Sequence, residues 1–128
     1  MKFSYYIKYW FPVIFYMGFI FYLSSLPTPI KTLIPKESLQ PYFDLPHIFY
    51  HIVEYLILSF LLYRALKVNS KYPQTLAIII TILYAITDEF HQYFVPGRIA
   101  SIFDILFDSF GAIAMQSIIN VYKWLKKS

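Results

Sequence analysis

Four apolar stretches dominate this chain of 128 residues, and each is close to the ~20 residues that a helix needs to cross a bilayer. They run over about 7–26, 46–66, 73–95 and 101–125. Hydrophobic residues make up 59% of the chain and charged residues only 14%, whereas soluble domains average roughly 45–50% and about 25%. A soluble protein of this size would expose large apolar patches. We therefore predict an all-α integral membrane protein, a four-helix transmembrane bundle formed by one domain over 1–128.

Local signals mark the ends of these stretches. The first follows a basic N-terminal segment, as a secretory signal does, but no small-x-small cleavage pattern comes after it, so we expect a retained membrane helix. A polar loop with four prolines runs from Pro27 to about Asp44, which we expect to cap the second helix. Pro96-Gly97 predicts a tight turn, and Ser101-Ile102-Phe103-Asp104 is of capping-box type before the fourth helix.

The placement of lysine and arginine predicts the orientation in the membrane. An even number of spans puts both termini and the loop between the second and third helices on one side, which carries eight of the eleven positive residues. Lys31, Lys36 and Arg98 lie on the other side. The excess favours cytoplasmic termini. Because the positive residues flank apolar runs, we expect membrane lipids as partners and no nucleic acid. The absence of cysteine excludes disulfides and thiolate metal sites.

Ionisable residues fall inside the predicted spans, where they are costly and usually face the bundle interior. Measured from the non-cytoplasmic edge at 1.5 Å per residue, His51, Asp88 and Asp108 lie about 10–12 Å deep. Five of the seven acidic residues and all three histidines lie in or beside these spans: Glu54, Asp88, Glu89, Asp104, Asp108, His47, His51 and His91. We interpret this clustering at one depth as a polar functional site.

Helical spacing groups these residues on common faces. Glu89 is rotated about 100° from Asp88, so we expect it to pair with Gln92 or with a neighbouring helix. Gly111 is small enough to let another helix approach closely. The predicted faces are His51 with Glu54 and Tyr55, Tyr84 with Asp88 and His91, and Ser101 with Asp104, Asp108 and Gly111.

Several carboxylates crowded in a low dielectric need compensation by protonation, histidinium, Arg98 or a bound cation. Two chemistries satisfy this requirement. A His–carboxylate pair would act as general acid and base on a lipid-linked group, or a divalent metal would be held between the helices. A third reading is hydrogen bonding between helices without further function. The candidate metal ligands are His51, Glu54, Asp88, His91, Asp104 and Asp108.

The same residues carry a resemblance to a known family. The run Thr87–Arg98, with the sequence TDEFHQYFVPGR, resembles the signature D-E-x-H-Q-x-F-x-P-G-R of the VanZ-like family. Ser101 to Gly111 is similar to its S-x-x-D continuation, and His51-Ile52-Val53-Glu54-Tyr55 matches its H-x-x-E-Y stretch. Ser24-Ser25 with Pro27 matches the end of its first helix. The matches extend over 24–111.

The resemblance implies a small polytopic protein of the bacterial cell membrane and envelope, in a family whose namesake is associated with resistance to teicoplanin, a lipophilic glycopeptide antibiotic. This chain departs from the family pattern twice. It has His47-Ile48 where members often have Asp-Lys, and Asp108 where they often have Asn.

We therefore expect an outward-facing polar cleft that binds or modifies a lipid-linked envelope precursor or an amphiphilic antibiotic. A non-catalytic binding or partner module is the alternative, followed by a proton or ion pathway, which the scarcity of ionisable groups in the cytoplasmic half disfavours. The expected catalytic residues are His51, Glu54, Asp88, His91 and Asp104. The expected substrate-binding residues are Glu89, Gln92, Arg98, Asp108, Ser24, Ser25 and Tyr55.

Overall fold

The computed structural model describes residues 2–27 and 45–128, and these form helices without strands. The expectations for Lys31, Lys36 and the Asp44 cap lie outside the described residues. The all-α prediction is confirmed. The first helix is continuous over Lys2–Ser25, made of α1 (Lys2–Tyr5), the π-helical η1 (Tyr6–Trp10) and α2 (Phe11–Ser25), and it is followed by α3 (Leu45–Leu66), α4 (Pro73–Tyr93) and α5 (Ile102–Lys127).

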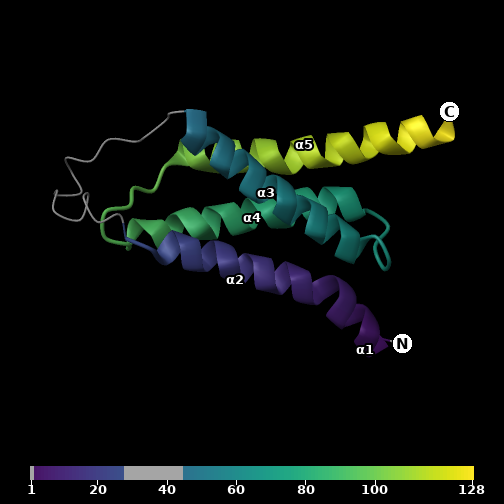
Figure 1. The fold of residues 1–128 in the computed structure, drawn as a ribbon, viewed down its shortest axis with the longest axis horizontal. Coiled ribbons are helices and arrows are strands. Elements are labelled where there is room, and N and C mark those ends of the chain that lie inside the picture. Colours follow the sequence, from purple (N-terminus) through teal and green to yellow (C-terminus); the bar gives the residue numbers. More distant parts are fainter. Residues whose placement is uncertain (1, 28–44) are drawn as a thin grey trace.

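The helices form an elongated bundle in which both termini lie at the same end (Figure 1). The turn between α3 and α4 lies at that end too, and the connection between α4 and α5 lies at the opposite end. α3 packs mainly against α5 and α4, and α2 contacts both α3 and α4. The arrangement agrees with the up-and-down order expected of successive spans.

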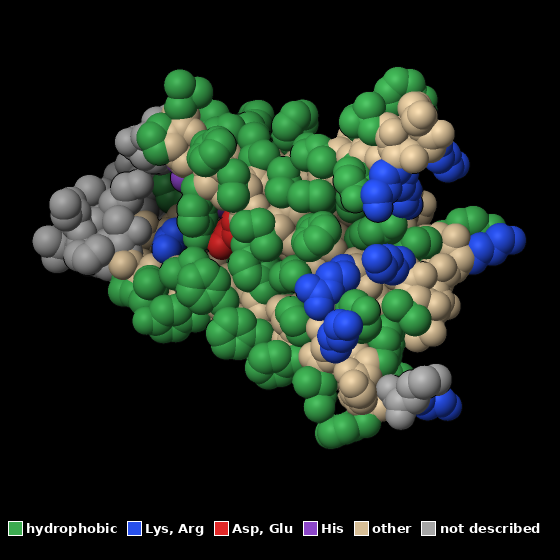
Figure 2. All heavy atoms as spheres, turned by 45° about the vertical axis from the view of Figure 1, so that its right-hand side comes forward, with side chains coloured by type: hydrophobic (Ala, Val, Ile, Leu, Met, Phe, Trp, Pro, Cys, Tyr) green, Lys and Arg blue, Asp and Glu red, His purple; other side chains and the backbone are tan. Residues whose placement is uncertain are grey.

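Within residues 2–27 and 45–128, three helices are long and apolar enough to cross a membrane, namely Lys2–Ser25, Leu45–Leu66 and Ile102–Lys127. α4 has 21 residues, but acidic, imidazole and amide side chains occupy its last two turns. Figure 2 shows apolar side chains over the sides of the bundle, while lysine and arginine gather at the end that holds the termini. The chain is therefore built as a multi-pass membrane protein.

The first helix begins at Lys2, earlier than predicted. It contains Pro12, which is the second residue after the π-helical segment η1. Pro12 has no N–H to donate to the carbonyl of Lys8 four residues before it. Arg64 of α3 satisfies this carbonyl instead, with its Nη2 at 3.0 Å from the oxygen. The Arg64 guanidinium also lies 5.1 Å from the centre of the Tyr9 ring. This contact fastens the N-terminal helix to α3.

The predicted turn at Pro96-Gly97 is confirmed. The Arg98 amide donates to the Val95 carbonyl at 3.1 Å, which closes a four-residue turn. Gly97 has a φ of 76°, as the third position of a type II turn requires. This turn ends the α4 segment and directs the chain toward α5.

Neutral polar side chains join the helices in the half of the bundle nearer the termini. Gln116 of α5 donates to the Ser59 hydroxyl of α3 at 2.7 Å, and Ser59 donates to the Ala112 carbonyl at 3.0 Å. Gln74 of α4 donates to Asn120 of α5 at 2.8 Å. These contacts contain no ionisable group.

Gly111 sets the distance between α3 and α5, as its small size predicted. A Cβ at this position would lie 2.3 Å from the Ile52 carbonyl oxygen and 3.1 Å from the Leu56 nitrogen. Both atoms belong to the backbone of α3, so they cannot turn away as a side chain would. The close approach of α3 and α5 at this point therefore depends on the glycine.

We expect Gly111→Ala to lower the free energy of unfolding by about 1–3 kcal/mol, the usual cost of overpacking. Gly18→Ala is the matched control, since a Cβ there meets nothing within 4 Å and alanine is the better helix former. Thermal unfolding of the detergent-purified variants measures both. Equal melting temperatures for the two variants would contradict the close packing of α3 on α5.

Candidate functional site

Two histidines of α3 face two aspartates of α5 at the bundle end opposite the termini. His47 Nε2 lies 2.9 Å from Asp104 Oδ1, and His51 Nδ1 lies 2.8 Å from Asp108 Oδ1. His51 Nε2 is also 3.8 Å from Asp104 Oδ2. Each pair of residues is spaced by four, so one helical turn of α3 matches one turn of α5. We use the name His–Asp cluster for five residues, namely these two histidines, these two aspartates and Glu89 of α4.

Glu89 reaches the cluster from α4 and anchors the start of α5. Its Oε2 accepts the backbone N–H of Ser101 at 2.9 Å. The Ser101 hydroxyl caps the helix by accepting the Phe103 N–H at 3.3 Å. The predicted capping box is therefore only half formed, because Asp104 bonds to His47 and leaves the Ser101 N–H to Glu89. Of the two expected partners of Glu89, the neighbouring helix is the observed one.

A second polar group surrounds Asp88 at the junction of α2, α3 and α4. Asp88 Oδ2 accepts the Tyr55 hydroxyl at 3.1 Å and the Gln92 amide at 3.3 Å. The same amide lies 3.4 Å from the Ser24 hydroxyl. We call these four residues the Asp88 group. It brings together Asp88 with three of the predicted substrate-binding residues.

Glu54 connects the Asp88 group and the His–Asp cluster. Its carboxylate accepts the Tyr50 hydroxyl at 2.9 Å, and it lies close enough to interact electrostatically with Asp88 and His51. Its backbone carbonyl accepts the Tyr16 hydroxyl of α2 at 2.9 Å. The expected face of His51, Glu54 and Tyr55 is thus turned inward, and all three side chains are buried.

His91 points toward α2 rather than toward the His–Asp cluster. Its Nε2 lies 2.9 Å from the Ser25 hydroxyl, and its ring stacks on Phe21 with the centres 4.3 Å apart. His91 therefore contacts Ser25, another predicted site residue, on the side of α4 that faces α2.

Arg98 binds the C-terminal end of α2. Its Nε and Nη2 donate to the carbonyls of Leu26 and Leu23, both at 3.0 Å. Carbonyls at a helix end have no partner within the helix, so the guanidinium satisfies groups that the fold would otherwise leave open. Arg98, which the sequence predicted as a substrate-binding residue, therefore holds the end of α2 in this structure.

Three buried carboxylate oxygens have no hydrogen-bond partner among the described residues: Asp88 Oδ1, Glu89 Oε1 and Asp108 Oδ2. The side chains that carry them are 4%, 3% and 0% exposed. A buried polar atom without a partner costs about 1–3 kcal/mol, and more when it is charged. These oxygens are therefore the places where a proton, a cation or a donor group of a bound molecule would be stabilised.

Two groups of three side chains are arranged so that they could hold a metal ion. One contains His47, His51 and Asp104, and the other contains His51, Glu89 and Asp108; within each, the ligand atoms lie within 4.8 Å of one another. Of the six predicted ligands, these groups include His51, Asp104 and Asp108. Glu54, Asp88 and His91 lie outside them.

His47 and Glu89 were not among the predicted metal ligands. The position of His47 one turn before His51 was the available signal, because histidines spaced by four share one helix face. For Glu89 the sequence offered only its rotation away from Asp88, which predicted pairing with Gln92 or a neighbouring helix and not metal binding.

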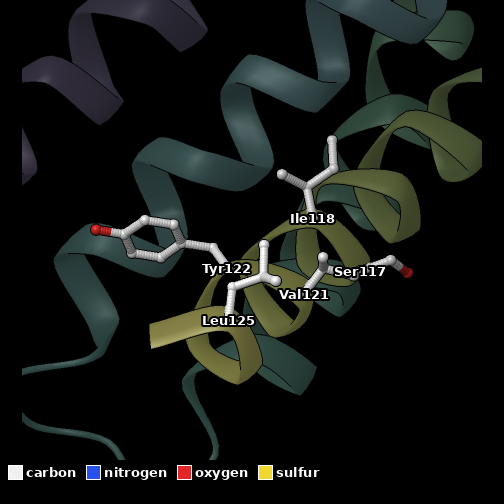
Figure 3. Close-up of a pocket in the computed structure, with 5 residues that line it drawn as sticks. All are labelled: Ser117, Ile118, Val121, Tyr122 and Leu125. Carbon is white, nitrogen blue, oxygen red and sulfur yellow. The ribbon is translucent and has the colours of Figure 1, made fainter. Parts of the chain in front are cut away.

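An apolar hollow on the surface of α5 is separate from this chemistry. Figure 3 shows this hollow, lined by Ser117, Ile118, Val121, Tyr122 and Leu125. It lies toward the C-terminal end of α5, whereas Asp104 and Asp108 lie in the first turns of that helix. Its apolar side chains suit contact with lipid chains rather than polar recognition.

A comparison with family models finds one match, a model described as VanZ/LLP1, over residues 3–123. No curated protein and no solved structure gives a significant match. The matched range includes α3 and α4, nearly all of the first helix, most of α5, and every residue of the His–Asp cluster and the Asp88 group.

Proposed function

Because the chain belongs to the VanZ/LLP1 family, we propose that it is a bacterial cell-envelope protein that binds or modifies a lipid-linked envelope molecule or an amphiphilic antibiotic. The observation that carries this proposal is the concentration of ionisable side chains at one end of an otherwise apolar bundle. His51, Glu54, Asp88, Glu89, Asp104 and Asp108 are all buried there.

The need to join the helices by hydrogen bonds does not by itself explain why these residues are ionisable. In the half of the bundle nearer the termini, the hydrogen bonds that join α3, α4 and α5 come from neutral groups, such as Ser59 with Gln116 and Gln74 with Asn120. Buried charges cost much more than neutral partners to remove from water. A bundle that joins helices with amides and hydroxyls at one end has no structural need for carboxylates and imidazoles at the other. This contrast supports a functional site.

The geometry suits proton transfer at two places. Asp108 fixes the orientation of the His51 ring through Nδ1, which leaves Nε2 to accept or donate a proton. In the Asp88 group, Tyr55 and Gln92 occupy one carboxylate oxygen and leave Oδ1 for a donor on the bound molecule. Glu54, Asp104 and His91 complete the proposed catalytic set.

The proposed binding residues lie around this set. Inside the bundle lie Glu89, Asp108, Gln92 and Tyr55. Ser24 and Ser25 lie at the end of α2, and Arg98 reaches that end from the connection between α4 and α5. Their mixture of carboxylate, amide, hydroxyl and guanidinium groups fits a polar head, while the apolar sides of the bundle fit a lipid tail.

We further propose that the termini are cytoplasmic, so that the site faces outward, where glycopeptides act on the envelope. The gathering of lysine and arginine at the terminal end supports this orientation (Figure 2).

Single cysteines test the orientation cleanly in a chain that has none of its own. Asn69→Cys lies in the α3–α4 turn and Ala100→Cys between α4 and α5, and both positions are exposed. In intact cells an impermeant thiol reagent should label only the Ala100 variant, and after permeabilisation it should label both. Labelling of only the Asn69 variant in intact cells would reverse the orientation and place the site in the cytoplasm.

Teicoplanin susceptibility tests the function. Expression of the wild-type chain in a susceptible Gram-positive host should raise the inhibitory concentration, and Asp104→Asn should abolish the increase at equal membrane abundance. Gln74→Met, which removes a bond in the other half of the bundle, should retain it. If the wild-type chain changes neither susceptibility nor the composition of the lipid-linked precursor pool, the proposed function is wrong.

A further inference from the structure

The Nε2 atoms of two histidines converge on one carboxylate. His47 Nε2 lies 2.9 Å from Asp104 Oδ1, and His51 Nε2 lies 3.8 Å from Asp104 Oδ2. The centres of the two rings are 4.6 Å apart. Histidines spaced by four on a helix with a carboxylate opposite are a donor set for divalent transition metals. Ligand atoms around zinc lie roughly 3.3 Å apart at bond lengths of about 2.0–2.2 Å, so small side-chain movements suffice.

The second nitrogen of His51 strengthens this assignment. Its Nδ1 lies 2.8 Å from Asp108 Oδ1. When Asp108 is ionised, its oxygen can only accept a hydrogen bond, so Nδ1 then carries the proton. In the neutral ring, Nε2 then presents a lone pair to Asp104, another acceptor. Two acceptors face each other favourably only when a proton or a cation lies between them. The order carboxylate, histidine and metal is the common pattern around ligating histidines.

An independent observation comes from the oxygens without partners. Asp108 Oδ2 and Glu89 Oε1 are buried and unbonded among the described residues, and with His51 their side chains form the second group within 4.8 Å. Three carboxylates thus surround His51, and few donors are available to them. A divalent cation supplies the positive charge that such a buried set requires.

We propose that His47, His51 and Asp104 bind a divalent transition-metal ion, zinc by preference, with Asp108 orienting His51 and Glu89 lying beside the site. Two imidazoles with a carboxylate favour zinc over magnesium or calcium, which take oxygen ligands. The inference deepens the proposed function and rests on it for the bound molecule, next to which the ion supplies a Lewis acid.

Metal analysis tests the proposal without reference to activity. Protein carrying a non-histidine tag is purified in detergent from zinc-supplemented cells, and zinc is measured against protein by mass spectrometry. We expect about one equivalent in the wild type, as for a dedicated site, and near-complete loss in His47→Ala and His51→Ala. Asp108→Asn should weaken zinc binding about 10–100-fold. His91→Gln, which lies outside both groups, should retain the metal.

Chelated wild-type protein provides a second measurement in case a variant fails to fold. Titration with zinc alone should restore about one equivalent, and cobalt should give the visible spectrum of a site with nitrogen and oxygen ligands. A folded wild type that takes up neither ion would overturn the metal site. If the purified protein binds neither ion but its expression in cells still alters teicoplanin susceptibility, the proposed function survives and the metal site is wrong. If the purified protein binds zinc but its expression does not alter susceptibility, only the proposed function is wrong.

Discussion

Replacing His51 by leucine should lower the free energy of unfolding by about 1–3 kcal/mol, the usual cost of leaving a buried hydrogen-bonding group without its partner. His51 and Asp108 are 5% and 0% exposed, and their 2.8 Å contact is the closest within the His–Asp cluster. Without the imidazole, Asp108 would have no hydrogen-bond partner among the described residues. The measurement is denaturant unfolding in detergent, on protein freed of metal by chelation.

The double variant His51→Leu/Asp108→Leu separates stability from function. Replacing both partners by apolar residues of similar size is often neutral or stabilising, so most of the lost stability should return. The effect on teicoplanin susceptibility should not return, because both groups act in the site. Phe49→Leu, at an exposed position of α3, controls for changes in the helix itself. A single variant as stable as the wild type would contradict the buried pair.

Asp88→Asn should abolish function while leaving the bundle intact. The amide oxygen of asparagine can still accept from Tyr55 and Gln92, as Asp88 Oδ2 does, so we expect a stability change below about 1 kcal/mol. The variant loses the carboxylate oxygen that would accept a proton or bind a donor. A general acid or base typically contributes about 10²–10⁴-fold in rate, so the increase in inhibitory concentration should disappear.

Thr81→Val is the matched control for Asp88→Asn. Thr81 is a buried residue of α4 whose hydroxyl has no partner among the described residues, and it lies two turns from Asp88. Valine should leave abundance, melting temperature and susceptibility unchanged. Full retention of function in Asp88→Asn would contradict our interpretation of the Asp88 group, and loss of abundance together with function would favour a purely structural role.

The helices and the gathering of polar residues at one end of the bundle were predictable from the sequence. The apolar stretches predict the helices, and the rise per residue places His51, Asp88 and Asp108 at similar distances from the same ends of their helices. The close approach at Gly111 also followed from its lack of a side chain. The early start of the first helix did not, because the carbonyl that Pro12 leaves open is satisfied by Arg64, more than fifty residues away.

The partners within the site were less predictable, because they depend on how each helix is rotated about its axis. His91 shares a face with Asp88 by spacing, but the packing of α2 turns it to Ser25. Glu89 meets Ser101 only because the turn at Gly97 brings the start of α5 back to α4. His47 joins the cluster because α3 and α5 run in register. Residue spacing predicts which side chains share a helix face, whereas the packing of the helices decides which faces contact one another.

The central claim is that the buried polar end of the bundle acts on an envelope molecule, and photo-crosslinking in living cells tests it most directly. A benzophenone amino acid replaces Tyr50, which is 46% exposed and bonded to Glu54, or Tyr122, which is 58% exposed in the apolar hollow of α5 (Figure 3). After irradiation, mass spectrometry identifies the captured molecules. We predict that the Tyr50 position captures a lipid-linked envelope molecule that the Tyr122 position does not. Capture of the same phospholipids in the same proportions at both positions would contradict the account.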